Sequence, residues 1–334
     1  MYRLFYLVVL LVPVIEAGEV IDAIHERAYL RCGVSTGFTG FSSIDEHGQW
    51  IGFDVDFCRA LSAALFNDPS RVEFVPLTNK DRFLSLNKGH IDVLSRVTSW
   101  NFKRDTSLGV VFSAISFYDG QSVMVDAASN IQTLADLDQK SVCLITGSTT
   151  ERNLFERVDQ MGLSIEPVIF TTASAMMRAY QLNRCDAITT DRVSLEIIQQ
   201  EITTPDRQHR VLDEYIAKEP LAVAVGRQDM DWLLLTRWVM YVMIIAEEWG
   251  INQMNVNEWF DSDALPNSQR RFLNGGGYHE LQAMGLKPGW VKQVIELVGN
   301  YSDVFQRNFK PLGIKRDLNR LWVDGGLLYA PPFE

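Results

Sequence analysis

The sequence has little cysteine and little histidine, and neither is arranged to hold a metal. Four cysteines and five histidines occur in 334 residues, without a Cys-x-x-Cys pair or a Cys/His spacing typical of zinc. The histidines are scattered, and no nucleophile is paired with a base. We therefore expect no metal, no cofactor and no catalytic residues. The histidines are His25, His47, His90, His209 and His279.

Basic residues are outnumbered, and long apolar runs are scarce. The chain has 31 Lys and Arg against 42 Asp and Glu, a net charge of -11, which is unfavourable for nucleic-acid binding. Beyond the N-terminus, one stretch, Leu233–Ala246, is apolar enough to suggest a membrane span. Thr236 and Arg237 interrupt it, and Glu247 and Glu248 end it. We expect a buried amphipathic helix there.

The first residues resemble an export signal. Arg3 precedes an apolar stretch, Leu4–Ile15, that is too short to cross a bilayer, and Ala17-Gly18 offers small residues for cleavage. We interpret residues 1–17 as a signal peptide and expect a periplasmic protein. An uncleaved anchor or a buried strand is the alternative.

The even number of cysteines in an exported chain favours two disulfides. Four cysteines allow three pairings. Cys32–Cys58 and Cys143–Cys185 are preferred because each pair then lies within one expected lobe. Four buried free thiols are the alternative.

More than 300 residues exceed what one hydrophobic core usually supports, so two lobes are expected. Strand and helix patterns alternate from residue 29 and begin again after residue 140, which is typical of parallel sheets with crossover helices. The first series is Tyr29–Val34 (strand), a helix capped by Asp54 and ending at Phe66, Val72–Pro76 (strand), Asp81–Asn87 (helix) and Ile91–Ser95 (strand). The second is Ser141–Ile145 (strand), Thr149–Met161 (helix), Glu166–Phe170 (strand), Ser174–Asn183 (helix) and Asp186–Thr190 (strand).

Ser116–Val125 is an extended run between these series, and Leu221–Val225 is a second extended run that carries the chain back. Two strands crossing between the lobes would form a hinge. In open α/β sheets, ligands bind beyond the carboxyl ends of the strands. Four loops are therefore expected to meet at one cleft. They cover residues 35–41, 95–104, 146–150 and 190–192.

Several short motifs, in order over nearly the whole chain, resemble the polar amino-acid-binding proteins of ABC importers. They are Gly33-Val34-Ser35 with Phe38 and Phe41, Gly52-Phe53-Asp54-Val55-Asp56, Ile91-Asp92-Val93, and Arg104 with Phe112-Ser113. Further segments resemble the general L-amino-acid-binding branch. They are Asp105–Gly109, Tyr118–Gln121, Cys185-Asp186, Gly299-Asn300-Tyr301 and Gly325–Pro332.

This resemblance implies an α/β fold of the type II periplasmic-binding class, with two lobes joined by a two-strand hinge and a C-terminal helical extension packed on lobe 1. The expected boundaries are residues 25–121 and 222–264 for lobe 1, 122–221 for lobe 2, and 265–334 for the extension.

The resemblance also assigns the two charged residues that a free amino acid requires. Arg104 would bind the ligand carboxylate, since its planar guanidinium matches that group. Asp191 would bind the ammonium. The alternatives are a surface arginine within Lys103-Arg104-Asp105 and a helix cap for residues 193–200.

Other contacts are assigned on the same basis. Ser148, Thr149 and Thr150 precede or begin a helix and would offer donors to an anion, although ordinary capping is the alternative. Val97 would present a main-chain carbonyl and Ser99 a hydroxyl. The family has threonine more often at Ser99 and Asn101, so the role of Asn101 is open.

Phe38 would stack on the ligand side chain, with a core position as the alternative. Ser35 stands where relatives that select cationic or particular polar ligands carry an acid, which favours broad specificity. Arg96, Asn79, Lys80 and Arg82 are left open as further contacts.

The sequence therefore predicts a monomeric substrate-binding component that passes free L-amino acids to ABC transporter permease subunits in the inner membrane. Two alternatives stay open. One is a periplasmic dehydratase of prephenate-like acids on the same fold, and the other is a sensor or adhesive surface protein.

Overall fold

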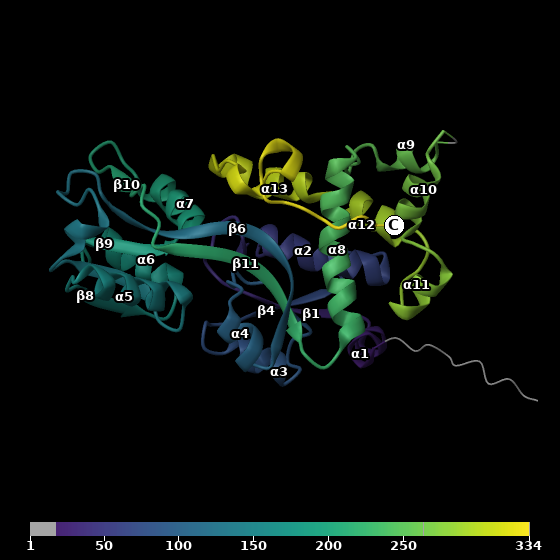
Figure 1. Ribbon diagram of the computed structural model, residues 1–334, viewed down its shortest axis with the longest axis horizontal. Coiled ribbons are helices and arrows are strands. Elements are labelled where there is room, and N and C mark those ends of the chain that lie inside the picture. Colours follow the sequence, from purple (N-terminus) through teal and green to yellow (C-terminus); the bar gives the residue numbers. More distant parts are fainter. Residues whose placement is uncertain (1–17, 263, 334) are drawn as a thin grey trace, which may run out of the picture.

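A computed structural model describes residues 18–262 and 264–333, so the predicted signal peptide, 1–17, lies outside the described residues. Most strands join one continuous sheet with the order β4-β1-β5-β11-β6-β9-β7-β8, and β10 (His209–Val211) pairs with β6. Figure 1 shows an elongated molecule in which β6 and β11 run between two groups of elements.

The first group contains parallel strands β1 (Leu30–Val34), β4 (Val72–Pro76) and β5 (Val93–Leu94). The predicted strands are therefore present, although β5 is shorter than expected. Helices and a small hairpin connect them. These are α1 (Glu19–Arg27), β2 (Ser43–Ile44), β3 (Trp50–Ile51), α2 (Phe53–Phe66), α3 (Arg82–Asn87) and α4 (Phe102–Ser107).

The second group contains parallel strands β7 (Ser141–Ile145), β8 (Glu166–Phe170) and β9 (Ala187–Asp191). Its helices are α5 (Thr149–Met161), α6 (Ala173–Gln181) and α7 (Arg192–Ile202), with a 3-10 turn, η1 (Leu134–Leu137). The predicted bounds of β7, β8 and α5 are confirmed without change.

Two long antiparallel strands, β6 (Val110–Asp126) and β11 (Ala217–Gly226), connect the groups (Figure 1). Both are longer than the predicted extended runs. Their register places Asp119 opposite Glu219, while β6 also places Gln121 opposite Asp191 of β9. The crossing therefore brings three carboxylates from three strands into one region.

The buried apolar residues form separate clusters. Two clusters cover the two faces of β7 and β9, and one of these contains Met176 and Leu195 while the other contains Leu144 and Leu154. A third surrounds Phe112 near α3 and β5. The largest cluster extends from Ile21 to Ala330 and includes α2 and α8 (Met230–Glu248).

Helix α8 is the expected buried helix, with Val239 and Val242 fully inaccessible to solvent. Among residues 18–262 and 264–333, no helix combines the length and apolar character that a membrane crossing requires.

The C-terminal segment packs on the first group through α12 (Trp290–Leu297) against α2 and α8, and through α13 (Tyr301–Phe309) against α8. Its rings complete an aromatic cluster, and Arg307 pairs with buried Asp56 at 2.9 Å. That cluster comprises Phe41, Phe53, Phe117, Tyr301, Phe305 and Phe309. The elements here are α9 (Val256–Phe260), α10 (Asn267–Asn274), α11 (Tyr278–Ala283), α12 (Trp290–Leu297), α13 (Tyr301–Phe309), η2 (Lys310–Leu312), η3 (Asp317–Asn319) and η4 (Trp322–Asp324).

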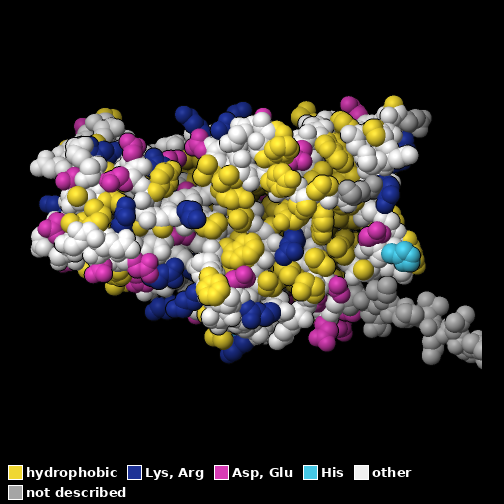
Figure 2. All heavy atoms as spheres, viewed as in Figure 1, with side chains coloured by type: hydrophobic (Ala, Val, Ile, Leu, Met, Phe, Trp, Pro, Cys, Tyr) yellow, Lys and Arg dark blue, Asp and Glu magenta, His cyan; other side chains and the backbone are white. Residues whose placement is uncertain are grey.

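Apolar side chains also gather on the outer surface in the region of α8 and the C-terminal segment (Figure 2). The contacts of that segment agree with its expected position on lobe 1, whereas the lobe boundaries themselves stay predictions.

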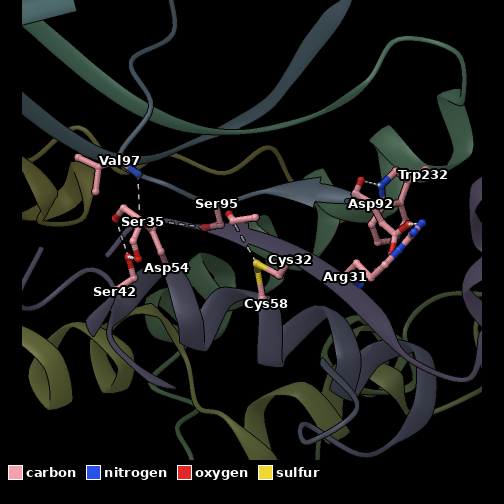
Figure 3. Close-up of a disulfide and its surroundings, with 11 residues drawn as sticks. Arg31, Cys32, Ser35, Ser42, Asp54, Cys58, Asp92, Ser95, Val97 and Trp232 are labelled. Atoms are coloured by element: carbon pink, nitrogen blue, oxygen red, sulfur yellow. Dashed lines mark hydrogen bonds and ion pairs between the residues drawn. A yellow bond between two sulfur atoms is a disulfide. The ribbon is translucent and has the colours of Figure 1, made fainter. Parts of the chain in front are cut away.

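Both predicted disulfides are present, so the alternative of four free thiols is wrong. Cys32–Cys58 joins β1 to α2, with its Cα atoms 6.3 Å apart (Figure 3). Cys143–Cys185 joins β7 to the residue two positions before β9, at 5.6 Å. Each bridge connects a central strand to its own group of elements.

Candidate ligand-binding cleft

A cavity lies between the two groups of elements, close to the crossing strands. All four predicted loops contribute side chains to it, and Arg104 and Asp191 share its wall. The lining residues are Phe38, Asn79, Arg82, Arg96, Val97, Ser99, Arg104, Ile145, Ser148, Thr149, Thr150, Thr190 and Asp191.

The cavity is narrow because its walls touch. Ser99 Oγ lies 3.0 Å from Thr149 Oγ1, and the amide of Asn79 donates to the carbonyl of Thr146 at 3.4 Å. The volume is about 30 Å³, room for roughly two water molecules. A ligand as large as an amino acid can enter only if the walls separate, so the structure corresponds to a closed arrangement.

Arg104 extends from helix α4, whose first turn is capped by Asn101. The Asn101 side-chain oxygen accepts from the backbone N–H of Arg104 at 3.0 Å, which gives Asn101 a structural role. Arg104 is 7% exposed, and its guanidinium donates to the carbonyl of Ser99 at 2.8 Å and lies over the ring of Phe83. Burial lowers the pKa of Arg104 to about 10, and the nearby Glu219 opposes this shift.

Asp191 ends β9, and its side chain is buried. It is 7% exposed, and its Oδ1 has no hydrogen-bond partner among the described residues. Although Asp191 precedes α7, its side chain does not cap that helix. Burial, and then the charges of Glu219 and Asp119, raise the pKa of Asp191 well above its usual value. A cation beside this carboxylate would offset the desolvation cost of ionising it.

The loop after β7 presents hydroxyl groups at the start of α5. Ser148 caps the helix, because its Oγ accepts from the N–H of Glu151 at 2.9 Å, so ordinary capping does occur. Thr149 and Thr150 are buried and line the cavity. Capping by Ser148 leaves these two residues in the first turn facing the cavity.

Val97 has an unusual backbone that is held in place by Asp54. Its φ of +41° is costly for a β-branched residue and needs support from its surroundings. Asp54 supplies this support, since it accepts from the N–H of Val97 at 3.0 Å and from the hydroxyl of Ser95 at 2.9 Å (Figure 3). Burial raises the pKa of Asp54 to about 6, and these two hydrogen bonds oppose the shift.

The predicted capping role of Asp54 is therefore wrong. Gly52 occupies the N-cap position of α2, and Asp54 lies inside the first turn. Its carboxylate instead accepts hydrogen bonds from Ser95 and Val97 of the 95–97 turn. The sequence signal was an acid within the apolar run Phe53-Asp54-Val55, which is typical of a buried acid with a polar partner.

Two further arginines line the cavity. Arg96 donates to the carbonyl of Leu77 at 2.9 Å and to the side-chain oxygen of Asn79 at 2.7 Å. Arg82 is 2% exposed and donates to Thr98 Oγ1 at 3.3 Å, while its Nε has no partner among the described residues. Lys80, also left open by the sequence, is exposed and lies outside the lining. The cavity is therefore rich in guanidinium groups.

Ser35 and Phe38 differ in position. Ser35 is fully buried outside the cavity lining, with its Oγ 2.7 Å from that of Ser42, and Ser42 donates to its carbonyl (Figure 3). The structure therefore does not bring Ser35 into the cavity, because its hydroxyl holds the following turn together. Phe38, from that turn, does line the cavity.

Glu219 was not anticipated from the sequence. It is 1% exposed on β11 and accepts from Thr149 Oγ1 at 3.0 Å and from the amide of Asn153 at 2.8 Å. The only local signal is a charge directly before the apolar end of a strand, Glu219-Pro220-Leu221.

Comparisons with known proteins agree with this architecture. Residues 30–230 match the family described as bacterial extracellular solute-binding proteins, family 3. The general L-amino acid-binding periplasmic protein AapJ of Rhizobium johnstonii is 41% identical, over 95% of this chain and 93% of the relative. The glutamate/glutamine/aspartate/asparagine-binding protein BztA of Rhodobacter capsulatus is 36% identical, over 95% and 94%.

A solved ABC transporter / periplasmic binding protein from Brucella ovis, with glutathione bound, superposes with a TM-score of 0.88 at 39% identity. The match covers 93% of this chain and 98% of the Brucella ovis protein. The fold is therefore the predicted type II periplasmic-binding fold with a helical C-terminal extension, and the chain belongs to family 3 of the bacterial extracellular solute-binding proteins.

Proposed function

We propose that this chain is the periplasmic substrate-binding component of an ABC importer and that it captures free L-amino acids between its two lobes. The observation that carries the proposal is the placement of Arg104 and Asp191 in one interlobe cavity. The names of the relatives, which are amino-acid-binding periplasmic proteins, support the same ligand class.

Each end of the zwitterion has a partner of opposite charge. Arg104 binds the carboxylate and exchanges its hydrogen bond to the Ser99 carbonyl for one to the ligand. Asp191 binds the ammonium through Oδ1, which has no hydrogen-bond partner in residues 18–262 and 264–333. The hydroxyl groups of Ser99, Thr149 and Thr150 then face the ligand, and the walls close around it by bending of β6 and β11.

Within this proposal, residues 25–121 and 222–264 form lobe 1, residues 122–221 form lobe 2, and residues 1–17 direct export. The closed, loaded form is delivered to permease subunits in the inner membrane. Binding and release require no chemical step, and the relatives are solute-binding proteins, so we propose no enzymatic activity. They give no support to a dehydratase.

The mature chain, from residue 18, can be tested by thermal shift against the twenty L-amino acids, with prephenate as an added compound. A ligand at 100 times its Kd stabilises the folded state by about 2.7 kcal/mol, which raises the melting temperature by several degrees. Several amino acids are expected to do so. If none shifts the melting temperature at millimolar concentration, or if prephenate is consumed, the proposal is wrong.

A further inference from the structure

A second, smaller chamber lies beside the cleft cavity, and Phe38 lines both of them. Phe38 packs against the large apolar cluster of the first group and also against the cluster of the second group that contains Met176. It therefore stands between two spaces as well as between two cores. Since Arg104 and Asp191 lie in the cleft cavity, the second chamber is available to another part of a ligand.

The walls of the second chamber come from both groups of elements. One wall is the 37–39 turn of the first group, and the other is formed by α6 and α7 of the second group. A Cβ atom added to Gly37 would lie 3.8 Å from Cβ of Ser174, so the walls nearly touch. The volume is about 20 Å³, room for roughly one water molecule. The walls of the cleft cavity also belong to both groups, so the two spaces widen together when the walls separate.

The backbone of Phe38 is held in place, whereas its side chain is only half-buried. The carbonyl of Phe38 accepts from the backbone N–H of Phe41 at 3.0 Å and from that of Ser42 at 2.9 Å. A movement of the ring must therefore come from rotation about its side-chain bonds. Such a rotation would widen one of the two spaces at the expense of the other.

The two spaces differ in charge. The wall of the cleft cavity carries Arg82 and Arg96 in addition to Arg104. In the part of the chain that the structure describes, the second chamber is lined by no Lys or Arg, and its charged residue is Glu201. Glu201 is exposed and makes no ion pair with a described residue. An acidic side chain is therefore favoured on the arginine side of Phe38, and a cationic one on the other side.

Most of the second chamber is apolar. Met177 of α6 and Ile197 and Ile198 of α7 supply aliphatic surface. Burying each methylene of a ligand against such a surface strengthens binding about fourfold. Ser194 also lines the chamber and is 4% exposed, and its Oγ has no hydrogen-bond partner among the described residues. The lining thus suits an aliphatic chain that ends near the exposed carboxylate of Glu201.

We propose that the chamber beyond Phe38 is a second side-chain subsite, which takes long aliphatic side chains that are neutral or cationic at their end. This inference rests on the proposed amino-acid-binding function. The α-carboxylate and the α-ammonium stay with Arg104 and Asp191 for every ligand, and the side chain enters the space that matches its charge. Acidic side chains turn to the arginine side instead. One cleft can then accept amino acids of opposite charge.

Titration calorimetry at low ionic strength, where charges are least screened, tests this subsite with three ligands. L-Lysine and L-norleucine share an unbranched aliphatic side chain and differ in the terminal ammonium, and L-glutamate represents the acidic ligands. The variants are Glu201→Gln, which removes the negative charge, and Ser194→Leu, which fills the chamber without breaking a hydrogen bond to a described residue. Glu166→Gln, at an exposed position of β8, is the matched control.

The parent and Glu166→Gln are expected to bind all three ligands. Glu201→Gln should bind L-lysine about threefold more weakly, the effect of one exposed charge, and L-norleucine and L-glutamate as the parent does. Ser194→Leu should weaken binding of L-lysine and L-norleucine about tenfold or more, because the added carbons occupy the space of the ligand side chain, and should leave L-glutamate within about twofold. Circular dichroism checks that each variant is folded, and if Ser194→Leu is not, Glu201→Gln decides.

The outcomes separate the two proposals. If no amino acid binds the parent, the proposed function fails and this inference fails with it. If L-glutamate binds the parent but L-lysine and L-norleucine do not, the inference alone is overturned. The inference is also overturned if Ser194→Leu weakens all three ligands equally, or if Glu201→Gln binds L-lysine as tightly as the parent.

Discussion

The carboxylate of Asp119 accepts a hydrogen bond from the backbone N–H of Val193 at 3.1 Å. A residue of the crossing strand β6 thus satisfies a free donor at the start of α7, a role normally filled by the N-cap side chain. The N-cap residue of α7 is Asp191, and its side chain makes no such bond. Because Asp119 takes over the capping, Asp191 can face the cavity.

Arg104 should carry much of the affinity for the ligand carboxylate. Arg104→Ala should weaken amino-acid binding by 30-fold or more, because loss of one member of a desolvated charge pair costs about 2–5 kcal/mol. Calorimetry with the best ligand of the parent measures this change. Lys103→Ala, an exposed neighbour on the same helix, should bind within twofold of the parent. Binding by Arg104→Ala within a few-fold of the parent would show that the carboxylate lies elsewhere.

For Asp191, ligand affinity and stability should change in opposite directions. Asp191→Asn should weaken amino-acid binding at least 30-fold, since the ammonium loses its counter-charge. The ligand-free protein should become more stable by about 1 kcal/mol, because the variant lacks the cost of ionising a buried carboxyl whose Oδ1 has no hydrogen-bond partner among the described residues. Melting temperatures with and without ligand test both effects, and Asp213→Asn, at an exposed position, is the control. A less stable variant with normal affinity would contradict the assignment.

Arg82 should influence which amino acids bind. Its guanidinium is buried in the cavity wall, and its Nε has no partner among the described residues, so a second carboxylate in the ligand would stabilise it. Arg82→Gln should lower the affinity for L-glutamate about tenfold more than that for L-glutamine. Competition binding with both ligands measures the ratio. Arg71→Gln, exposed on the surface, should leave the ratio unchanged, and an unchanged ratio in Arg82→Gln itself would argue against this role.

Asp54 should make the protein less stable as the pH rises from about 4 to about 6. Burial raises its pKa in the folded state to about 6, so the folded protein binds more protons than the unfolded chain in this range. Stability must then fall with rising pH, by about 1.4 kcal/mol for each unit of the pKa shift. Asp54→Asn lacks this dependence. Denaturation at pH 4.5 and 7.5 measures the free energy of unfolding of both proteins. The value for the variant minus the value for the parent should be larger at pH 7.5 than at pH 4.5. The same difference at both pH values would contradict the prediction.

The disulfide Cys143–Cys185 joins residues 42 positions apart in the second group. Replacing both cysteines by serine should lower the free energy of unfolding by about 4 kcal/mol in the chain-entropy estimate. Urea denaturation monitored by fluorescence measures the loss. The corresponding double variant at Cys32 and Cys58, which are 26 positions apart, should lose slightly less. If a reducing agent left the free energy of unfolding of the parent unchanged, both predicted losses would be contradicted.

The sequence was most informative where local signals decide the structure. The bounds of α5 follow from Ser148 as its cap and from Gly162, which takes the left-handed conformation after its last turn. The four cleft loops were located because strand ends share one edge of a sheet. Arg104 and Asp191 were assigned through family resemblance, since local charge patterns alone favour a surface arginine and a helix cap.

The residues that sequence reasoning missed depend on contacts between distant segments. Asp119 and Glu219 are 100 positions apart, and only the register of β6 and β11 brings them together. Asp54 meets Val97 through the packing of α2 beneath the sheet, and no local motif specifies that contact. Ser35 lies outside the cavity lining, because its hydroxyl meets that of Ser42 within the same turn.

The six aromatic rings shared by the first lobe and α13 have a consequence for shortened forms of the protein. A chain cut after residue 264 would lose Tyr301, Phe305 and Phe309, and Phe41, Phe53 and Phe117 would face water. Three exposed rings on one surface invite aggregation. The last seventy or so residues are thus an integral wall of the first lobe, and a minimal fragment cut to the length of shorter binding proteins would precipitate rather than fold.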